Sequence, residues 1–215
     1  MIDTVLFDFD GTIMDTNRVI IGSWQHTFKT LRGREGDLYY ILSTFGEPLV
    51  KSLKKTFPEV STERSMKIYR DWQSKRFLDM IELFPGTEEM LAEIRKRGYK
   101  TGIATSRLRE SLELALEKFD LTKYFDAIVS IEDIENPKPA PDTILKALEK
   151  LDAKPENAIM VGDSILDILC AKNADVASVL VSWSATLSEK AKEDFAEGER
   201  PDYIIQQPGE LLDII

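Results

Sequence analysis

The stretch Val5-Leu6-Phe7-Asp8-Phe9-Asp10-Gly11-Thr12 begins as an apolar, strand-like run and ends in two carboxylates, a glycine and a hydroxyl. A buried strand should not carry two acids unless it is about to leave the core, because burying an unpaired charge is unfavourable. We therefore expect Asp8 and Asp10 at the carboxyl end of a strand and just beyond it. In an open parallel sheet, ligands bind at that edge.

Asp8 and Asp10 are two residues apart, so both side chains face the same side if the chain stays extended. Neighbouring carboxylates repel each other, and a bound cation removes that repulsion. Mg2+ takes oxygen ligands and is commonly held by one or two carboxylates together with a substrate phosphate. The pair therefore predicts a Mg2+ site at the end of the first strand.

The composition indicates a globular, acidic protein. Of its 215 residues, 43% are hydrophobic, enough for a sizeable core. Lys and Arg total 28 against 38 Asp and Glu, giving a formal net charge of −10, which argues against broad binding to nucleic acid or to anionic membranes. We expect no secretory leader, no membrane span and no intrachain disulfide, since Cys170 is the one cysteine. These features suit a cytoplasmic protein.

Residues 15–81 show only helical patterns, with apolar residues at helical spacing and no strong strand. Helices are expected in four places: from a cap at Asp15 or Thr16 to a break at Gly33, at 38–44, at 49–57, and from Ser61 through Met80. This segment should form an all-helical insert directly after the first strand.

Beyond a turn at Pro85-Gly86, strands and helices alternate. Strands are expected at 99–105, 127–130, 158–161, 178–181 and 203–205, and helices at 88–97, 110–119, 142–151, 165–173, 187–196 and 210–214. Such alternation predicts an α/β fold with a parallel sheet covered on both faces. We therefore expect a core domain of residues 1–14 and 82–215, and a helical domain of residues 15–81.

Polar residues recur where the expected strands end. They are Thr105 and Ser106, Lys138 in the Pro-rich loop 137–141, and Asp163 with Asp167 one helical turn beyond it. Right-handed crossovers leave the carboxyl ends of the strands along one edge of the sheet. These side chains should therefore converge with Asp8 and Asp10.

The first two acids suit phosphoryl transfer. Asp8 would attack phosphorus, as carboxylates do in ATPases that form an aspartyl phosphate. Asp10 would protonate the leaving oxygen and then take a proton from the water that hydrolyses the acyl phosphate. Gly11 would permit a close backbone approach where a side chain would clash.

The remaining polar residues suit the metal and the phosphoryl oxygens. Asp163 would complete the metal site, and Asp167 would hold metal-bound waters or orient the ligands. The Thr105 hydroxyl, backbone N–H groups near Ser106, and Lys138 would neutralise the phosphoryl oxygens. In phosphoryl transfer, positioning and charge neutralisation of this kind supply most of the catalysis.

Each of these residues also has a structural alternative. Thr105 and Ser106 could begin a helix, Lys138 could be solvated, and a carboxylate such as Asp167 could face helix N–H groups. The joint occurrence of the motifs at strand ends favours a site. Cys170 is expected to be a small buried hydrophobe on a helix.

Four segments, 8–12, 105–106, 138–139 and 162–167, resemble the motifs of the haloacid dehalogenase (HAD) superfamily of phosphatases. The helical insert resembles the cap of its phosphoglycolate-phosphatase-like branch. The resemblance implies a Rossmann-like parallel-sheet core with an inserted all-helical, C1-type cap. It also implies Mg2+-dependent hydrolysis of a small phosphorylated substrate through an aspartyl phosphate.

Site residues carry over to the matching positions. The resemblance implies Asp8, Asp10, Thr105 and Lys138 as catalytic residues, and Asp8, Asp10, Asp163 and Asp167 around the metal. It implies substrate contacts from Gly11, Thr12, Thr105, Ser106 and Lys138 and, in the cap, from Gly46.

The substrate and the assembly stay open. Segments 151–156, 181–183 and 201–203 look like bacterial pyrophosphatases of this branch, so both a phosphoglycolate-like metabolite and inorganic pyrophosphate are candidates. A β-phosphoglucomutase-like phosphosugar mutase is disfavoured, since Ile20 stands where such mutases place a His. A non-catalytic regulator that binds phospho-ligands is a further alternative. We expect no nucleic-acid or membrane partner, and either a monomer or a homodimer.

Overall fold

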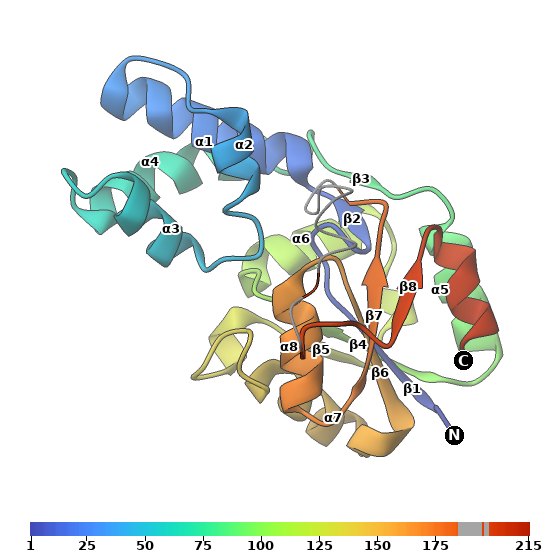
Figure 1. The fold of residues 1–215 in the computed structure, drawn as a ribbon. Helices are drawn as coiled ribbons and strands as arrows, with labels where there is room; N and C mark the ends of the chain where they lie inside the picture. The colour runs from blue at the N-terminus through green and yellow to red at the C-terminus, as the bar shows by residue number, and fades with distance from the viewer. Residues whose placement is uncertain (185–194, 196–197) are drawn as a thin grey trace. The chain divides into compact units, whose positions relative to one another are not determined.

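The computed structural model describes residues 1–184, 195 and 198–215 (Figure 1). The chain divides into two compact units, Met1–Asp15 with Leu83–Ile215, and Thr16–Glu82. The boundaries expected from the sequence differ from these by one residue at each crossing. Two short strands at the crossings, β2 (Met14–Asp15) and β3 (Glu82–Leu83), form a separate two-stranded sheet that the sequence patterns did not predict.

A six-stranded sheet forms the centre of the first unit. In spatial order its strands are β5 (Ala127–Val129), β4 (Lys100–Ala104), β1 (Thr4–Phe7), β6 (Ala158–Gly162), β7 (Ala177–Val181) and β8 (Tyr203–Ile205). Every neighbouring pair is parallel. The central strand β1 is buried along its whole length, as its apolar run requires. The predicted α/β class with a parallel sheet is confirmed.

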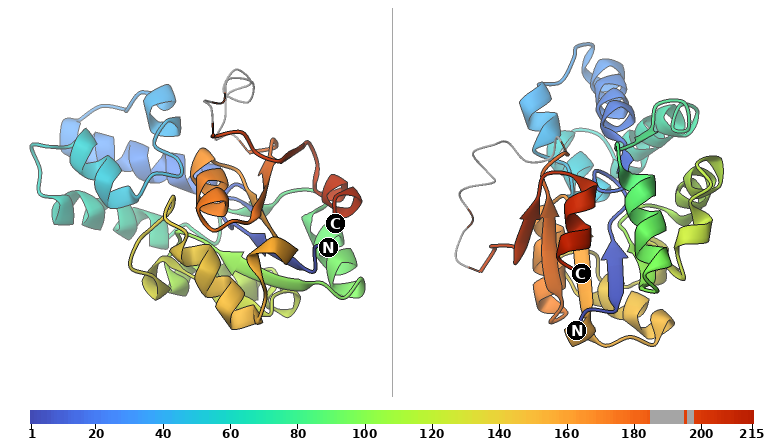
Figure 2. Two further views of the ribbon diagram at one scale, coloured as in Figure 1. Left: turned by 60° about the horizontal axis from the view of Figure 1, so that its bottom comes forward. Right: turned by 90° about the vertical axis from the view of Figure 1, so that its right-hand side faces the viewer.

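Helices cover both faces of this sheet. On one face, α7 (Asp142–Leu151) and α8 (Ile165–Asn173) pack over Leu6 and Met160. Because crossovers between parallel strands are right-handed, α5 (Thr87–Lys96) and α6 (Arg109–Lys118) lie on the other face (Figure 2). The described part of this unit also contains the 3-10 helices η1 (Thr122–Tyr124), η2 (Ile131–Asp133), η3 (Pro155–Asn157) and η4 (Pro208–Asp213).

Two expectations near the C-terminus need comment. The helix expected at 210–214 is the 3-10 helix η4, which starts two residues earlier at Pro208. The helix expected at 187–196 falls almost wholly outside the described residues. None of the helices in ranges 1–184 and 198–215 is long and apolar enough to cross a membrane.

The second unit consists of α1 (Asn17–Arg32), α2 (Leu38–Leu42), α3 (Leu49–Thr56) and α4 (Thr62–Ser74). Its core is an aromatic cluster of Trp24, Phe28, Phe57 and Tyr69, with ring centroids 4.9–6.4 Å apart in the contacting pairs. The helix α4 ends at Ser74 and does not run through Met80. The sequence pattern predicted a longer helix because Phe77 continues the helical spacing of apolar residues. Phe77 is buried, but it lies in the turns after α4.

Helices α1 and α4 approach closely at Gly22. A Cβ added to Gly22 would lie 2.3 Å from the ring of Trp72, a distance that no packed side chain tolerates. A glycine in the middle of a helix lowers its helix propensity, but at this position only a glycine leaves room for the ring of Trp72.

Candidate active site

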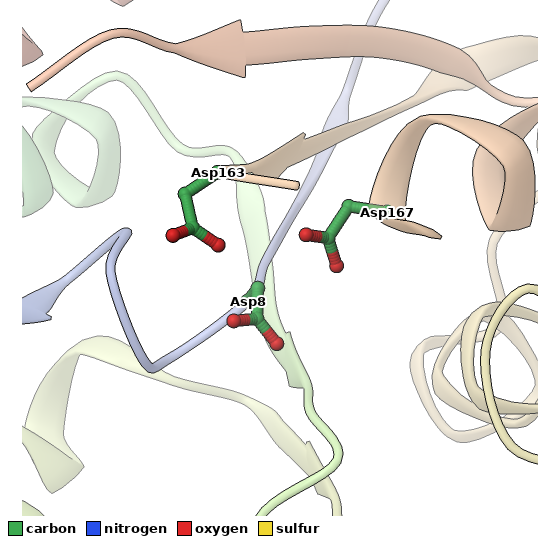
Figure 3. A group of neighbouring side chains, drawn as sticks. All are labelled: Asp8, Asp163 and Asp167. Carbon is green, nitrogen blue, oxygen red and sulfur yellow. The ribbon is translucent and has the colours of Figure 1, made fainter. Parts of the chain in front are cut away.

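Three carboxylates meet at the carboxyl edge of the sheet. Asp8 follows β1, Asp163 follows β6, and Asp167 lies in the first turn of α8. One oxygen of each lies within 4.8 Å of the others, and Figure 3 shows the three side chains grouped together. They are 7%, 6% and 2% exposed, respectively. Buried negative charge at this density requires compensation.

Lys138 supplies part of that compensation. Its ammonium donates to Asp8 Oδ1 at 2.8 Å, to Asp167 Oδ1 at 2.6 Å and to the carbonyl of Ala104 at 2.7 Å. These three bonds use all three N–H donors of a lysine. Lys138 is buried, so the solvated alternative is wrong.

Helix α8 fixes the loop that carries Lys138. The thiol of Cys170 donates to the carbonyl of Ala140 at 3.0 Å, and Asn173 Nδ2 donates to the carbonyl of Pro139 at 2.9 Å. Asp167, Cys170 and Asn173 are three residues apart and so share one face of the helix. This face holds both the lysine and the main chain next to it. Cys170 is buried on a helix, as predicted.

Burial and the Lys138 ammonium act in opposite directions on the pKa of Asp8. The pKa of Asp8 is raised from 3.8 to about 7, because burial, together with the charges of Asp167 and Asp10, outweighs the lowering effect of Lys138. For Lys138, burial alone lowers the pKa, but the carboxylates of Asp167 and Asp8 outweigh burial and raise it above its usual value. Lys138 therefore stays protonated, and ionised Asp8 gains from any further positive charge.

The charge balance of this cluster fits a divalent cation. Three ionised carboxylates and one ammonium carry a formal charge of −2. Carboxylate oxygens are the ligands that Mg2+ prefers. Asp8, Asp163 and Asp167 are therefore the residues that would hold Mg2+.

The carboxylate of Asp10 has a different partner. Arg107 Nε donates to both oxygens of Asp10, at 3.1 and 2.9 Å, and Arg107 Nη2 donates to Oδ1 at 2.6 Å. Arg107 is itself 8% exposed and also donates to Ser111 Oγ at 3.2 Å. Within the described part of the chain, the acid cluster does not include Asp10. The carboxylate of Asp10 thus pairs with Arg107, and its expected place among the metal ligands stays a prediction.

A tight turn brings the chain from Asp10 back to β2. The amides of Ile13 and Met14 both donate to the carbonyl of Phe9, and the amide of Gly11 donates to the carbonyl of Met14. Gly11 has a φ of 76°, and a Cβ added there would lie 1.9 Å from Asp163 Oδ2. A glycine is required here because the carboxylate of Asp163 occupies the space of a side chain.

The two carboxylate oxygens of Asp167 have different partners. Its Oδ2 accepts from the amide of Ser164 at 3.1 Å and from the Ser164 hydroxyl at 2.6 Å, in a capping box at the start of α8. Its Oδ1 accepts from Lys138. The structural alternative is therefore confirmed on Oδ2, Oδ1 pairs with Lys138, and a role of Asp167 toward a metal stays a prediction.

The expected substrate contacts lie in several environments. Thr105 is buried, and its hydroxyl accepts from the amide of Arg107 at 3.3 Å, whereas Ser106 is exposed. Thr12 is 1% exposed, and its hydroxyl has no hydrogen-bond partner among the described residues. Gly46 belongs to the helical unit, in a turn with a φ of 79°. Substrate contact by these four residues stays a prediction.

Two polar contacts of the site were not predicted from the sequence patterns. Arg107 directly follows Thr105-Ser106, and that position was the available signal. Ser184, three residues beyond β7, donates to Asp163 Oδ2 at 2.7 Å and lies in no recognisable motif. Both partners are distant in the sequence, so local spacing could not reveal them.

Fold and site together define a class of protein. A parallel α/β core with a helical insert, and buried acids bridged by a lysine at the strand ends, characterises a phosphoryl-transfer enzyme. The comparisons with known proteins make the class specific. A model of the family "Haloacid dehalogenase-like hydrolase" matches residues 5–181. The chain belongs to this family, which confirms the resemblance seen in its motifs.

Relatives match the chain over its whole length. A protein from Caldanaerobacter subterraneus subsp. tengcongensis, provisionally named pyrophosphatase PpaX, is 42% identical over 214 residues, covering 100% of this chain and 94% of the relative. A pyrophosphatase PpaX from Bacillus cereus is 37% identical, covering 100% and 96%. Among solved structures, a haloacid dehalogenase-like hydrolase from Streptococcus pneumoniae has a TM-score of 0.84 at 26% identity, covering 99% and 98%. The predicted enzyme class, a HAD-type phosphatase, is thereby confirmed.

Proposed function

We propose that the chain is a Mg2+-dependent phosphatase that hydrolyses inorganic pyrophosphate through an aspartyl phosphate on Asp8. The observation that carries this proposal is the buried cluster of Asp8, Asp163 and Asp167 bridged by Lys138, with Asp10 two residues beyond the nucleophile. The cluster provides a carboxylate nucleophile and a place for a divalent ion within one water-poor site.

Pyrophosphate is favoured over phosphoglycolate by the relatives. Those that are 37–42% identical over the full chain are named pyrophosphatases. The solved structures named as phosphoglycolate phosphatases are 18–22% identical and share the fold alone. The substrate is thus a small phosphorylated molecule, and we expect the enzyme to act in the cytoplasm as a monomer or homodimer.

The first step is attack by Asp8. A carboxylate oxygen of Asp8 forms a bond to phosphorus, and the bond from phosphorus to the leaving phosphate breaks. Lys138 holds Asp8 Oδ1 and, with the Thr105 hydroxyl, offsets the charge on the phosphoryl oxygens. When bound, Mg2+ would add positive charge beside these oxygens.

The second role belongs to Asp10. It gives a proton to the leaving phosphate, then takes one from the water that attacks the aspartyl phosphate, so that orthophosphate leaves and Asp8 is regenerated. Arg107 grips both oxygens of Asp10 and thereby limits the rotation of its carboxylate. Preorganisation of this kind holds the carboxylate in place as the base of the second step.

The alternatives have less support. Ile20, at the position of the mutase His, packs against the aromatic core of the helical unit. No predicted catalytic position in the core domain lacks its functional group, which weighs against a regulator without turnover.

A substrate panel tests the proposal. The full chain is assayed with Mg2+ against pyrophosphate, phosphoglycolate and glucose 1-phosphate, with phosphate release and sugar isomers as readouts. We expect the highest kcat/KM for pyrophosphate and complete loss of activity on chelation. Preference for phosphoglycolate would correct the substrate. An isomer of glucose 1-phosphate would indicate a mutase, and absence of turnover on every substrate would indicate the binding module.

A further inference from the structure

The segment after β7 reaches back to the site through two consecutive residues. Trp183 Nε1 donates to the carbonyl of Thr12 at 3.1 Å, and the indole ring lies 6.2 Å from the ring of Phe84. Ser184 is 6% exposed, and its hydroxyl donates to Asp163 Oδ2 at 2.7 Å. Trp183 therefore anchors the segment on the turn after β1, and Ser184 extends from that anchor to a carboxylate of the cluster.

The surroundings leave the Asp163 carboxylate little freedom. A Cβ placed on Gly11 would lie 1.9 Å from Asp163 Oδ2 and 2.8 Å from Ser184 Oγ, so the three groups pack against one another. Backbone on one side and a hydroxyl donor on the other thus define the position of Oδ2. The main chain of Asp163 is held by the sheet, because Asp163 directly follows β6.

We propose that Ser184 is a positioning residue for Asp163. Its hydroxyl holds Oδ2 and so keeps the carboxylate turned towards Asp8 and Asp167, in the arrangement that accepts a divalent cation. Partners that fix metal ligands in this way typically change metal affinity by about 10- to 100-fold when they are removed. This inference rests on the proposed Mg2+ site, and it gives Ser184 a role that acts through Asp163.

An isosteric pair of variants tests the hydroxyl itself. Ser184→Val and Ser184→Thr have nearly the same shape and differ in the hydroxyl. We expect Ser184→Val to weaken Mg2+ binding by about 10-fold, measured by calorimetry on the full chain without substrate. Ser184→Thr should bind within about two-fold of the natural chain, because it keeps the donor. Equal affinity in the two variants would overturn the proposal.

A matched control separates positioning from general damage. Ser178 on β7 also donates to an aspartate, Asp202 Oδ2, at 2.7 Å, but this pair lies outside the acid cluster. Ser178→Ala should lower the unfolding temperature and leave Mg2+ affinity unchanged, whereas Ser184→Ala should weaken Mg2+ binding even while circular dichroism shows a folded chain. Weaker binding in both variants to the same extent would assign the effect to lost stability and overturn the proposal.

The outcome also distinguishes this inference from the proposed function. If the natural chain binds no Mg2+, the proposed metal site fails, and the role of Ser184 fails with it. If the natural chain binds Mg2+ and Asp163→Asn abolishes binding while Ser184→Val does not weaken it, the proposed function survives and the positioning role alone is refuted.

Discussion

The two units of the chain carry opposite charge. Residues 16–82 contain twelve Lys and Arg against eight Asp and Glu, a net charge of +4. The rest of the chain contains sixteen against thirty, a net charge of −14. Their interiors differ as well. The helical unit buries an aromatic cluster, and its buried polar residues are all Ser or Thr, whereas the core buries three aspartates, a lysine and an arginine.

This difference separates stability from chemistry. Buried ion pairs contribute little net stability, because desolvation offsets their attraction. The ionised groups of the core are therefore best explained by catalysis, and the fold depends on the apolar layers beside them. The helical unit shows the opposite case, with an interior that follows from hydrophobic burial alone. Five experiments, in decreasing order of expected effect, challenge or refine this division.

The largest effect is expected from Asp8→Asn. Removing the nucleophile should reduce turnover by at least about 10⁴-fold, because no neighbouring group replaces a covalent step. Circular dichroism should show an intact fold. Asp3→Asn, the same substitution just before the other end of β1, should retain activity. Substantial turnover in Asp8→Asn would refute the aspartyl phosphate.

Trp24→Ala tests, in the helical unit, whether stability and metal binding are separate. Trp24 packs against Phe28, Phe57 and Tyr69, so its loss should destabilise the protein by about 4 kcal/mol in denaturant unfolding. Mg2+ affinity should stay unchanged, since every proposed ligand lies in the core. Loss of Mg2+ binding while the core remains folded would contradict the division.

Arg107→Met should lower kcat by on the order of 10²-fold with a smaller change in KM, because a misoriented Asp10 forfeits most of its acid–base contribution. Arg107→Lys should recover part of that loss. Arg109→Met is the matched control, since Arg109 pairs with Glu113 and Asp133 outside the cluster. If steady-state kinetics give the same kcat for Arg107→Met and Arg109→Met, Arg107 has no special role.

The raised pKa of Asp8 predicts a pH-dependent effect of the metal. Without Mg2+, the folded-state pKa of about 7 exceeds the unfolded value of 3.8, so this group stabilises the fold at low pH and loses that contribution as the pH rises through 7. Mg2+ favours the ionised form. The Mg2+-induced gain in unfolding free energy should therefore be greater at pH 8 than at pH 6, by about 1 kcal/mol. In Asp8→Asn the Mg2+-induced gain should be the same at both pH values. A larger gain at pH 6 than at pH 8 in the natural chain would contradict this prediction.

The smallest effect is expected from the charge of the helical unit. Lys54 and Lys55 are exposed, and reversing both to Glu should lower kcat/KM for an anionic substrate by about two-fold at low salt, with no effect at high salt. Reversing the exposed core residues Lys118 and Lys154 is the control. An equal loss there would assign the effect to net charge and not to the helical unit.

Much of the fold follows from local patterns. The apolar run before Asp8, the bounds of α7 and α8, and the alternation of strands and helices all agree with the structure, because side-chain periodicity reports which face is buried. The end of α4 at Ser74 was missed, because Phe77 fits the apolar spacing of the helix but is buried from the turns that follow it. The 3-10 form of η4 was missed because apolar spacing does not distinguish a short 3-10 turn from an α-helical one.

The sequence by itself determined which residues lie at the strand ends, and therefore where Asp8, Lys138, Asp163 and Asp167 would gather. Tertiary structure alone decided how they pair. Arg107 reaches Asp10 across 97 residues of sequence, and Ser184 reaches Asp163 from the segment that follows the neighbouring strand β7. The physical reason is that strand order and crossover hand fix backbone positions, whereas a side chain's partner depends on distances of a few ångströms set by packing from every side.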